Sequence, residues 1–183
     1  MLAQPCSFAI VKPGNPFAEP HVIVVMGVAA SGKTTIGRAL AYALGWPFYD
    51  GDDFHTPANK AKMHNGVPLT DEDRQPWLAA LGAKIGEIVR QREHAVVACS
   101  ALKVRYREVL VPAGTPAASV RFVYLDVSRA TLAARLAERQ HFFPASLLDS
   151  QLETLEPPGD AVWVDGTKPV SEIVELVRAA LRI

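Results

Sequence analysis

The sequence has no excess of charge of either sign, no long apolar run and very little cysteine. Its 183 residues include 19 Lys and Arg against 19 Asp and Glu, which gives a formal net charge of zero. A general nucleic-acid or membrane-surface binder normally carries a basic excess, so we expect neither partner. No apolar stretch reaches the roughly 18 residues that a transmembrane helix needs, so we expect no membrane span.

The cysteines are Cys6 and Cys99, far apart in the chain. Cys99 ends the apolar run 95–99, where a reduced, buried thiol is expected, and this usage suits a reducing cytoplasm.

The first twenty residues contain four prolines, and their apolar piece is too short for a signal peptide. We therefore expect a flexible N-terminal extension at 1–20 and one domain at 21–183, since this length fits a single core.

The feature around which the chain is organised is a glycine loop at residues 27–34, which reads G-x-x-x-x-G-K-T and follows the apolar run 22–26. A buried strand that turns through such a loop into a helix typically holds phosphates, because backbone N–H groups and the helix N-terminus point at one spot. Lys33 is expected to reach the β- and γ-phosphates, and Thr34 to bind Mg²⁺. The residues assigned to the nucleotide are Gly27, Ala30, Ser31, Gly32, Lys33, Thr34 and Thr35.

Strand-like and helix-like segments alternate along the rest of the chain. After the first strand at 22–26, further strands are predicted at 46–50, 95–99, 120–126 and 161–164. Gly45 is expected to end the first helix, and Thr56, Thr70 and Ser128 to begin later ones. Such alternation favours a three-layer α/β domain with a five-stranded parallel sheet and helices on both faces. Residues 140–155 lack a strand signal and are predicted to form a helical lid.

Two carboxylates, Asp50 and Asp52, follow the second strand directly. Ligands of open parallel sheets lie beyond the carboxyl ends of the strands, so this pair falls near the phosphates. Near Mg²⁺, one carboxylate of such a pair can hold a metal-bound water while the other takes a proton from an incoming hydroxyl. A solvated Asp-Gly turn is the alternative. The chain lacks the guanine-reading N/T-K-x-D, and its third strand ends in Cys-Ser rather than Asp-Glu, which disfavours a GTPase or a motor.

Several basic and polar residues are candidates for an anionic substrate, although each could also be an ordinary surface or core residue. They are His55, Lys62, Arg74, Ser100, Lys103, Arg107 and His141, and Asp52 of the carboxylate pair is counted with them. Two further arginines lie four residues apart on one predicted helix. Arg139 is expected to stabilise charge on the γ-phosphate, and Arg135 to stack on adenine; an exposed helix face is the alternative.

Three stretches together resemble the gluconokinases of the small P-loop type. They are residues 27–34, 50–55 and above all 59–78, which matches the family pattern N-x-x-K-M-x-x-G-x-P-L-x-D-x-D-R-x-P-W-L. The resemblance extends from residue 22 to the C-terminus. It implies a P-loop kinase fold with a mobile lid, ATP and Mg²⁺, and phosphorylation of D-gluconate at its 6-hydroxyl to 6-phospho-D-gluconate. It also implies a role in the pentose phosphate pathway and commonly a homodimer. It places Asp52 at the family's proposed base and Asp50 near the metal ion, which it would hold through water.

The lid departs from the family pattern R-x-G-H-F, because residues 139–142 read R-Q-H-F without the glycine.

Two alternatives to a gluconokinase stay open. One is a kinase for another small hydroxy acid such as shikimate, against which residues 59–78 argue. The other is a nucleotide-responsive binding protein, against which the intact set Lys33, Thr34, Asp50, Asp52 and Arg139 argues.

Overall fold

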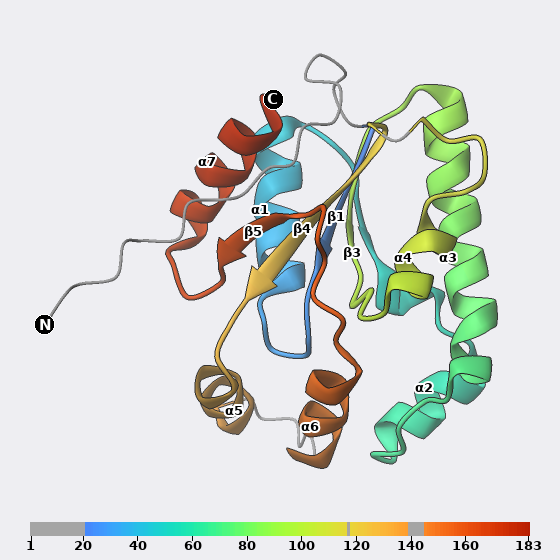
Figure 1. The fold of residues 1–183 in the computed structure, drawn as a ribbon, viewed down its shortest axis with the longest axis vertical. Helices are drawn as coiled ribbons and strands as arrows, with labels where there is room; N and C mark the ends of the chain where they lie inside the picture. Colours follow the sequence, from blue (N-terminus) through green and yellow to red (C-terminus); the bar gives the residue numbers. More distant parts are fainter. Residues whose placement is uncertain (1–20, 117, 139–144) are drawn as a thin grey trace, which may run out of the picture.

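A five-stranded parallel sheet forms the centre of the molecule (Figure 1). The computed structural model describes residues 21–116, 118–138 and 145–183; the predicted extension at 1–20 lies outside them. The strand order is β2-β3-β1-β4-β5, and every neighbouring pair is parallel. The strands are β1 (Val22–Met26), β2 (Phe48–Asp50), β3 (Ala95–Ala98), β4 (Val120–Asp126) and β5 (Val162–Asp165). The predicted fold class is therefore confirmed.

Helices cover both faces of the sheet. On one face lie α1 (Lys33–Leu44) and α7 (Val170–Leu181), and on the other α3 (Asp71–Gln91) and α4 (Val104–Leu110) (Figure 1). Ile23 and Val25 of β1 pack toward the first pair, while Val22 and Val24 pack toward the second. A strand buried on both faces has to be apolar at every position, which explains the unbroken run of aliphatic residues before the phosphate loop.

Side-chain caps set the helix starts where the sequence predicts them. Thr56 accepts from the Asn59 N–H and begins α2 (Pro57–His64), and Ser128 accepts from the Thr131 N–H and begins α5 (Arg129–Ala137). Thr70 begins α3 through a reciprocal capping box with Asp73. At the end of α1, Gly45 adopts the left-handed conformation with φ of 67°.

The edges of three strands differ from the prediction. The second strand begins at Phe48 rather than Trp46, because Pro47 has no N–H to donate and only its carbonyl joins the sheet, accepting from Val96 at 2.9 Å. The third strand ends at Ala98 rather than Cys99, and the fifth is shifted by one residue, to Val162–Asp165. The second strand still ends at Asp50, so the predicted position of Asp50 and Asp52 is unaffected.

A smaller apolar cluster lies beyond the carboxyl ends of the strands. It joins the loop after β1, through Val28 and Ala30, to Leu132 of α5 and Leu148 of α6 (Ala145–Thr154). Helix α6 forms most of the predicted lid region 140–155.

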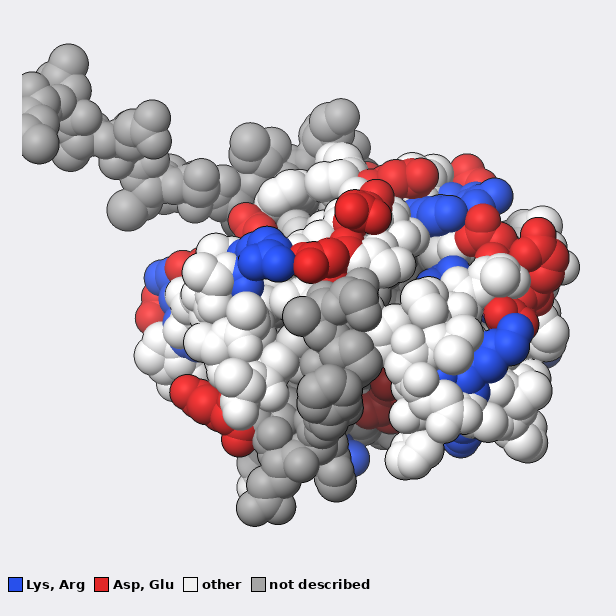
Figure 2. Space-filling model, turned by 90° about the horizontal axis from the view of Figure 1, so that it is seen from below, with Lys and Arg blue, Asp and Glu red and all other residues white. Residues whose placement is uncertain are grey.

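Seen from the end of the molecule where the strands end, basic and acidic side chains are interspersed over the surface (Figure 2), in line with the zero net charge. Within the described ranges, no helix has both the length and the apolar character that crossing a membrane requires.

Candidate active site

The glycine loop has the backbone geometry of a phosphate cradle. Gly27, Ala30 and Gly32 all have positive φ, at 144°, 60° and 105°. A side chain at Gly27 would collide with Ser31 and approach the Leu125 carbonyl, so the loop requires glycine there. Gly32 precedes α1, and no described side chain caps the first turn of that helix. The N-terminus of α1, where a helix stabilises negative charge, thus lies directly at the loop.

Two oxygen groups next to the loop suit a hard metal ion. Thr34 Oγ1 donates to Asp50 Oδ2 at 3.0 Å, and Asp50 Oδ1 accepts from the Asp52 N–H at 3.2 Å. The second bond fixes the Asp50 carboxylate at the start of the short helix η1 (Gly51–Phe54). Hydroxyl and carboxylate oxygens are ligands that Mg²⁺ takes, together with water and phosphate oxygens. Among the described residues, no group of three or more His, Cys, Asp or Glu could hold a metal ion by itself, so the ion would also need water and phosphate oxygens as ligands.

Beside the loop lies a pocket that we call the acceptor pocket. Its lining is Ala29, Lys33, Asp52, His55, Met63, Val67, Pro68, Leu69, Arg74, Trp77, Ser100, Leu102, Leu147, Ser150 and Gln151. Asp52 keeps some surface open to solvent, but partial burial of its carboxylate raises its pKa. The ammonium of Lys33 opposes that rise, and the charge of Asp50 adds to it. A raised pKa makes Asp52 a better proton acceptor than an ordinary surface aspartate.

Gly51, between the two aspartates, is needed where η1 approaches the sheet. A Cβ at Gly51 would lie 2.6 Å from the Ala98 carbonyl oxygen, and Trp77 Nε1 donates to the Gly51 carbonyl at 2.7 Å. Trp77 also stacks on His55, with ring centroids 4.1 Å apart. Trp77 therefore holds both η1 and His55 against one wall of the acceptor pocket.

His55 is buried, with 7% of its surface exposed. Burial is the main cause that lowers its pKa to about 4, and the positive charges of Arg74 and Lys60 lower it further. The amide Nδ2 of Asn59 lies 3.5 Å from His55 Nδ1 and donates to the Asp73 carbonyl at 2.6 Å. At neutral pH the imidazole is therefore uncharged, and it offers the pocket a neutral polar group.

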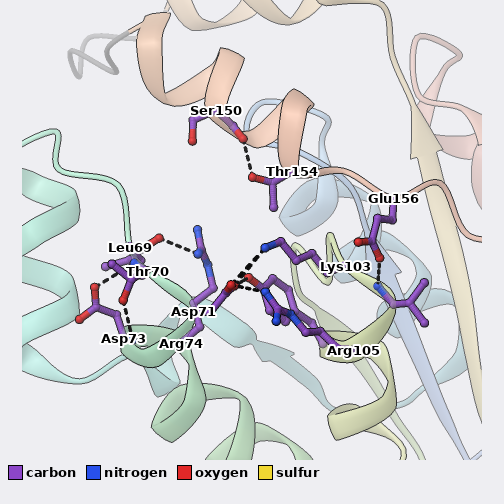
Figure 3. Close-up of polar contacts among 12 residues, drawn as sticks. Leu69, Thr70, Asp71, Asp73, Arg74, Lys103, Arg105, Ser150, Thr154 and Glu156 are labelled. Carbon is purple, nitrogen blue, oxygen red and sulfur yellow. Dashed lines mark hydrogen bonds and ion pairs between the residues drawn. The ribbon is translucent and has the colours of Figure 1, made fainter.

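Three of the predicted substrate cations are not among the residues that line the acceptor pocket, and each bonds other groups of the chain. Their contact with a substrate stays a prediction. Lys62 Nζ bonds both oxygens of Asp73, at 2.7 and 2.8 Å. Lys103 bonds Asp71, whose carboxylate also accepts from Arg105 and Tyr106 (Figure 3). The Tyr106 hydroxyl is the main cause that lowers the pKa of Asp71, to about 2, so the acid remains charged.

Arg107 is the third of these cations. It is buried and donates to the backbone carbonyls of Ala101 and Leu102, at 3.0 and 3.2 Å. Its guanidinium therefore braces the loop between β3 and α4. Arg74, by contrast, lines the acceptor pocket, where it donates to the Leu69 carbonyl at 2.6 Å and lies over the Tyr106 ring (Figure 3).

A second pocket lies on the other side of the loop. It is lined by Ala30, Ser31, Gly32, Thr35, Ile36, Arg135, Glu138, Gly166, Lys168 and Val170. Arg135 donates to the carbonyls of Ala30 and Ser31 at 3.2 Å each, and to that of Gly166 at 2.8 Å. Arg135 thus ties the phosphate loop to the segment after β5; its stacking on adenine stays a prediction.

Sequence reasoning missed Gln151, whose Oε1 accepts from the Ala29 N–H at 2.7 Å. A signal was present, because Leu147 and Gln151 are four apart and so share a helix face. The apolar lining from Met63 to Leu69 was also not assigned. Arg139 and His141, predicted for the γ-phosphate and the substrate, lie outside the described residues.

A phosphate loop flanked by two pockets on a five-stranded parallel sheet defines a P-loop phosphotransferase. A family model described as an AAA domain matches residues 22–158. The gluconokinase of Gluconobacter oxydans is 49% identical over 165 residues, covering 87% of this chain and 91% of that protein. The crystal structure of a gluconokinase from Sinorhizobium meliloti 1021 is 47% identical with a TM-score of 0.79, and the match covers 89% of this chain and 92% of that one. The chain belongs to the gluconokinase family.

More distant structures share the fold alone. The shikimate kinase from Aquifex aeolicus has a TM-score of 0.55 and 16% identity, with 88% of this chain and 96% of that one covered. The alternative of a shikimate-type kinase is therefore not favoured, and the predicted resemblance to gluconokinases is confirmed.

His55 should make stability depend on pH. Its pKa is about 4 when folded and about 6.5 in an unfolded chain, so between these values the unfolded state binds more protons and acid destabilises the fold. The contribution of uncharged His55 to the free energy of unfolding is fully present above about pH 6.5 and is lost as the pH falls toward 4. Between pH 7.5 and 5.0 the wild type should lose about 2 kcal/mol more free energy of unfolding in urea than His55→Gln. Equal losses in the two proteins would contradict the lowered pKa.

Proposed function

We propose that the protein is a gluconokinase that transfers the γ-phosphoryl group of ATP to the 6-hydroxyl of D-gluconate, giving 6-phospho-D-gluconate and ADP. The observation that carries this proposal is the joint presence of Lys33 and Asp52 in the acceptor pocket, directly beside the phosphate loop. A cation for the transferring group and a proton acceptor for the attacking hydroxyl thus face one space.

Each residue has a distinct role in the proposed reaction. The loop N–H groups and Lys33 hold the phosphates, and Asp52 accepts the proton of the 6-hydroxyl as its oxygen bonds to the γ-phosphorus and the bond to the bridging oxygen of ADP breaks. Thr34 would hold Mg²⁺ directly and Asp50 through water, since their oxygens fit that ion. When bound, Mg²⁺ supplies neutralising charge at the phosphates.

The carboxylate of gluconate requires a cation of its own. Of the Lys and Arg side chains that the structure describes, Lys33 and Arg74 line the acceptor pocket. Since Lys33 serves the phosphates, Arg74 is the residue that we assign to the carboxylate, which its planar guanidinium can bind through two parallel hydrogen bonds. The contacts of Arg74 with the Leu69 carbonyl and the Tyr106 ring support this role, because they restrict the side chain before the substrate arrives.

The remaining parts of the proposal rest on the residue types and on the resemblance to gluconokinases. Arg139 would stabilise the transferring group, Arg135 would contact adenine, and His55, Ser100 and His141 would contact the sugar acid. We also propose a kinase domain at 21–183 with a lid at about 140–155, a homodimer in the cytoplasm, and a place in the pentose phosphate pathway.

A panel of acceptors tests the substrate. With Mg²⁺ and ATP in an assay for ADP, D-gluconate should be phosphorylated, whereas glucose, which lacks the carboxylate, should show kcat/KM lower by about a hundredfold or more, because Arg74 is then left unpaired. Shikimate should likewise be a poor acceptor. Turnover of another acid in the absence of turnover with gluconate would overturn the assignment.

Replacement of the proposed base tests the chemistry. Asp52→Asn keeps the shape of the side chain but removes its proton affinity, so kcat should fall by about a hundredfold or more while ATP binding is retained. Asp53→Asn is the matched control, because Asp53 is the neighbouring aspartate and does not line the acceptor pocket. A loss of less than about tenfold for Asp52→Asn would remove this residue from the role of base.

A further inference from the structure

One peptide group of the phosphate loop is held from both of its ends. The carbonyl of Val28 accepts from Lys33 Nζ at 2.9 Å, and the N–H of Ala29 donates to Gln151 Oε1 at 2.7 Å. These two atoms belong to the same planar peptide unit, so they rotate together. The Val28 carbonyl also accepts from the Ser31 N–H at 3.3 Å. These hydrogen bonds together fix the orientation of a single plane, with Lys33 and Ser31 on the carbonyl side and helix α6 on the N–H side.

The Ala29 N–H has a side chain of helix α6 as its partner, whereas the Gly27 and Ser31 N–H groups bond backbone carbonyls. Phosphate loops use their N–H groups to bind phosphate oxygens, but this one is paired with a side chain of α6. If the Gln151 acceptor were removed, the Val28–Ala29 plane would be held on its carbonyl side alone, by Lys33 and the Ser31 N–H. The orientation of the plane, and with it the position of the Lys33 ammonium, would then be less restricted. A side chain on α6 thus acts on Lys33 without touching it.

We propose that Gln151 is a positioning residue that sets the location of the Lys33 ammonium by fixing the Val28–Ala29 peptide. The inference rests on the proposed function, in which Lys33 stabilises the transferring phosphoryl group. Because Gln151 also lines the acceptor pocket, this link lies at the end of the loop where transfer takes place. It makes the seating of α6 a condition for a correctly placed lysine.

Helix α6 is attached firmly enough to serve this purpose. Leu148 is buried in the cluster that contains Val28 and Ala30. Just after the helix, the Glu156 N–H donates to the Leu102 carbonyl at 2.9 Å, and the Glu156 carboxylate accepts from the Val104 N–H at 2.6 Å, at the start of α4 (Figure 3). The side chain of Gln151 is therefore presented from a helix packed on the loop and anchored beyond its C-terminal end.

The chemistry of the side chain also fits. An acceptor is needed to bind the Ala29 N–H, but a carboxylate in this place would add negative charge beside the γ-phosphate. The carboxamide supplies a neutral acceptor. Leucine has a similar size and no acceptor, which makes Gln151→Leu the informative variant.

Steady-state kinetics with ATP and gluconate give the first test. Gln151→Leu should lower kcat by about tenfold or more, the effect of about one hydrogen bond, while the KM for gluconate changes by less than about threefold. Glu153→Leu, two residues further along α6 and exposed, is the control and should stay within about twofold of the wild type in kcat. A kcat within twofold of the wild type for Gln151→Leu would overturn the proposal.

Amide hydrogen exchange in the ligand-free protein gives a second test that requires no turnover. The Ala29 N–H should exchange at least about tenfold faster in Gln151→Leu, while the Ile36 N–H, bonded to the Gly32 carbonyl at 2.9 Å, keeps its rate. An unchanged rate at Ala29, or an equal acceleration at both amides, would contradict a specific bond. Failure of the wild type to phosphorylate gluconate would refute the proposed function and leave this exchange result standing.

Discussion

The structure depends on the abrupt turn that the chain makes after its central strand. β1 is buried on both faces and has a partner on each side, so its carboxyl end has one fixed position. From there the chain passes through left-handed positions at Gly27 and Gly32 into α1. Because a backbone turn of this kind leaves N–H groups facing inward, the phosphate site follows from the strand order and from two residues without side chains.

Several charged side chains near the acceptor pocket form ion pairs with one another, and this pairing determines which cations face a ligand. Asp73 binds Lys62, and Asp71 binds Lys103, so a chain region rich in cations presents few of them to a ligand. An unpaired cation in a partly enclosed pocket binds an anion more strongly than one on an open surface, because less solvent screens it. In the proposed function, Arg74 is the cation that selects a sugar acid.

The helix ends and the phosphate loop could be predicted from the sequence because they depend on residues that are close together in the chain. Thr70, Ser128 and Gly45 act within one helical turn, and the glycine loop acts within eight residues, so their roles could be inferred from neighbours in the chain. The contacts of Arg107 and Gln151 could not be inferred in this way. Gln151 meets a peptide that lies 122 residues away, and the direction of Arg107 depends on how α4 packs. Such pairings follow from tertiary packing, which residue types alone do not specify.

The central claim is that Asp52 and Arg74 receive the two ends of gluconate in the acceptor pocket, while the nucleotide phosphates occupy the loop. A crystal structure with Mg²⁺, a non-hydrolysable ATP analogue and D-gluconate tests it most directly. It should place the 6-hydroxyl within about 3 Å of an Asp52 carboxylate oxygen, and the gluconate carboxylate against the Arg74 guanidinium. Gluconate bound in the reverse direction, or outside this pocket, would contradict the account.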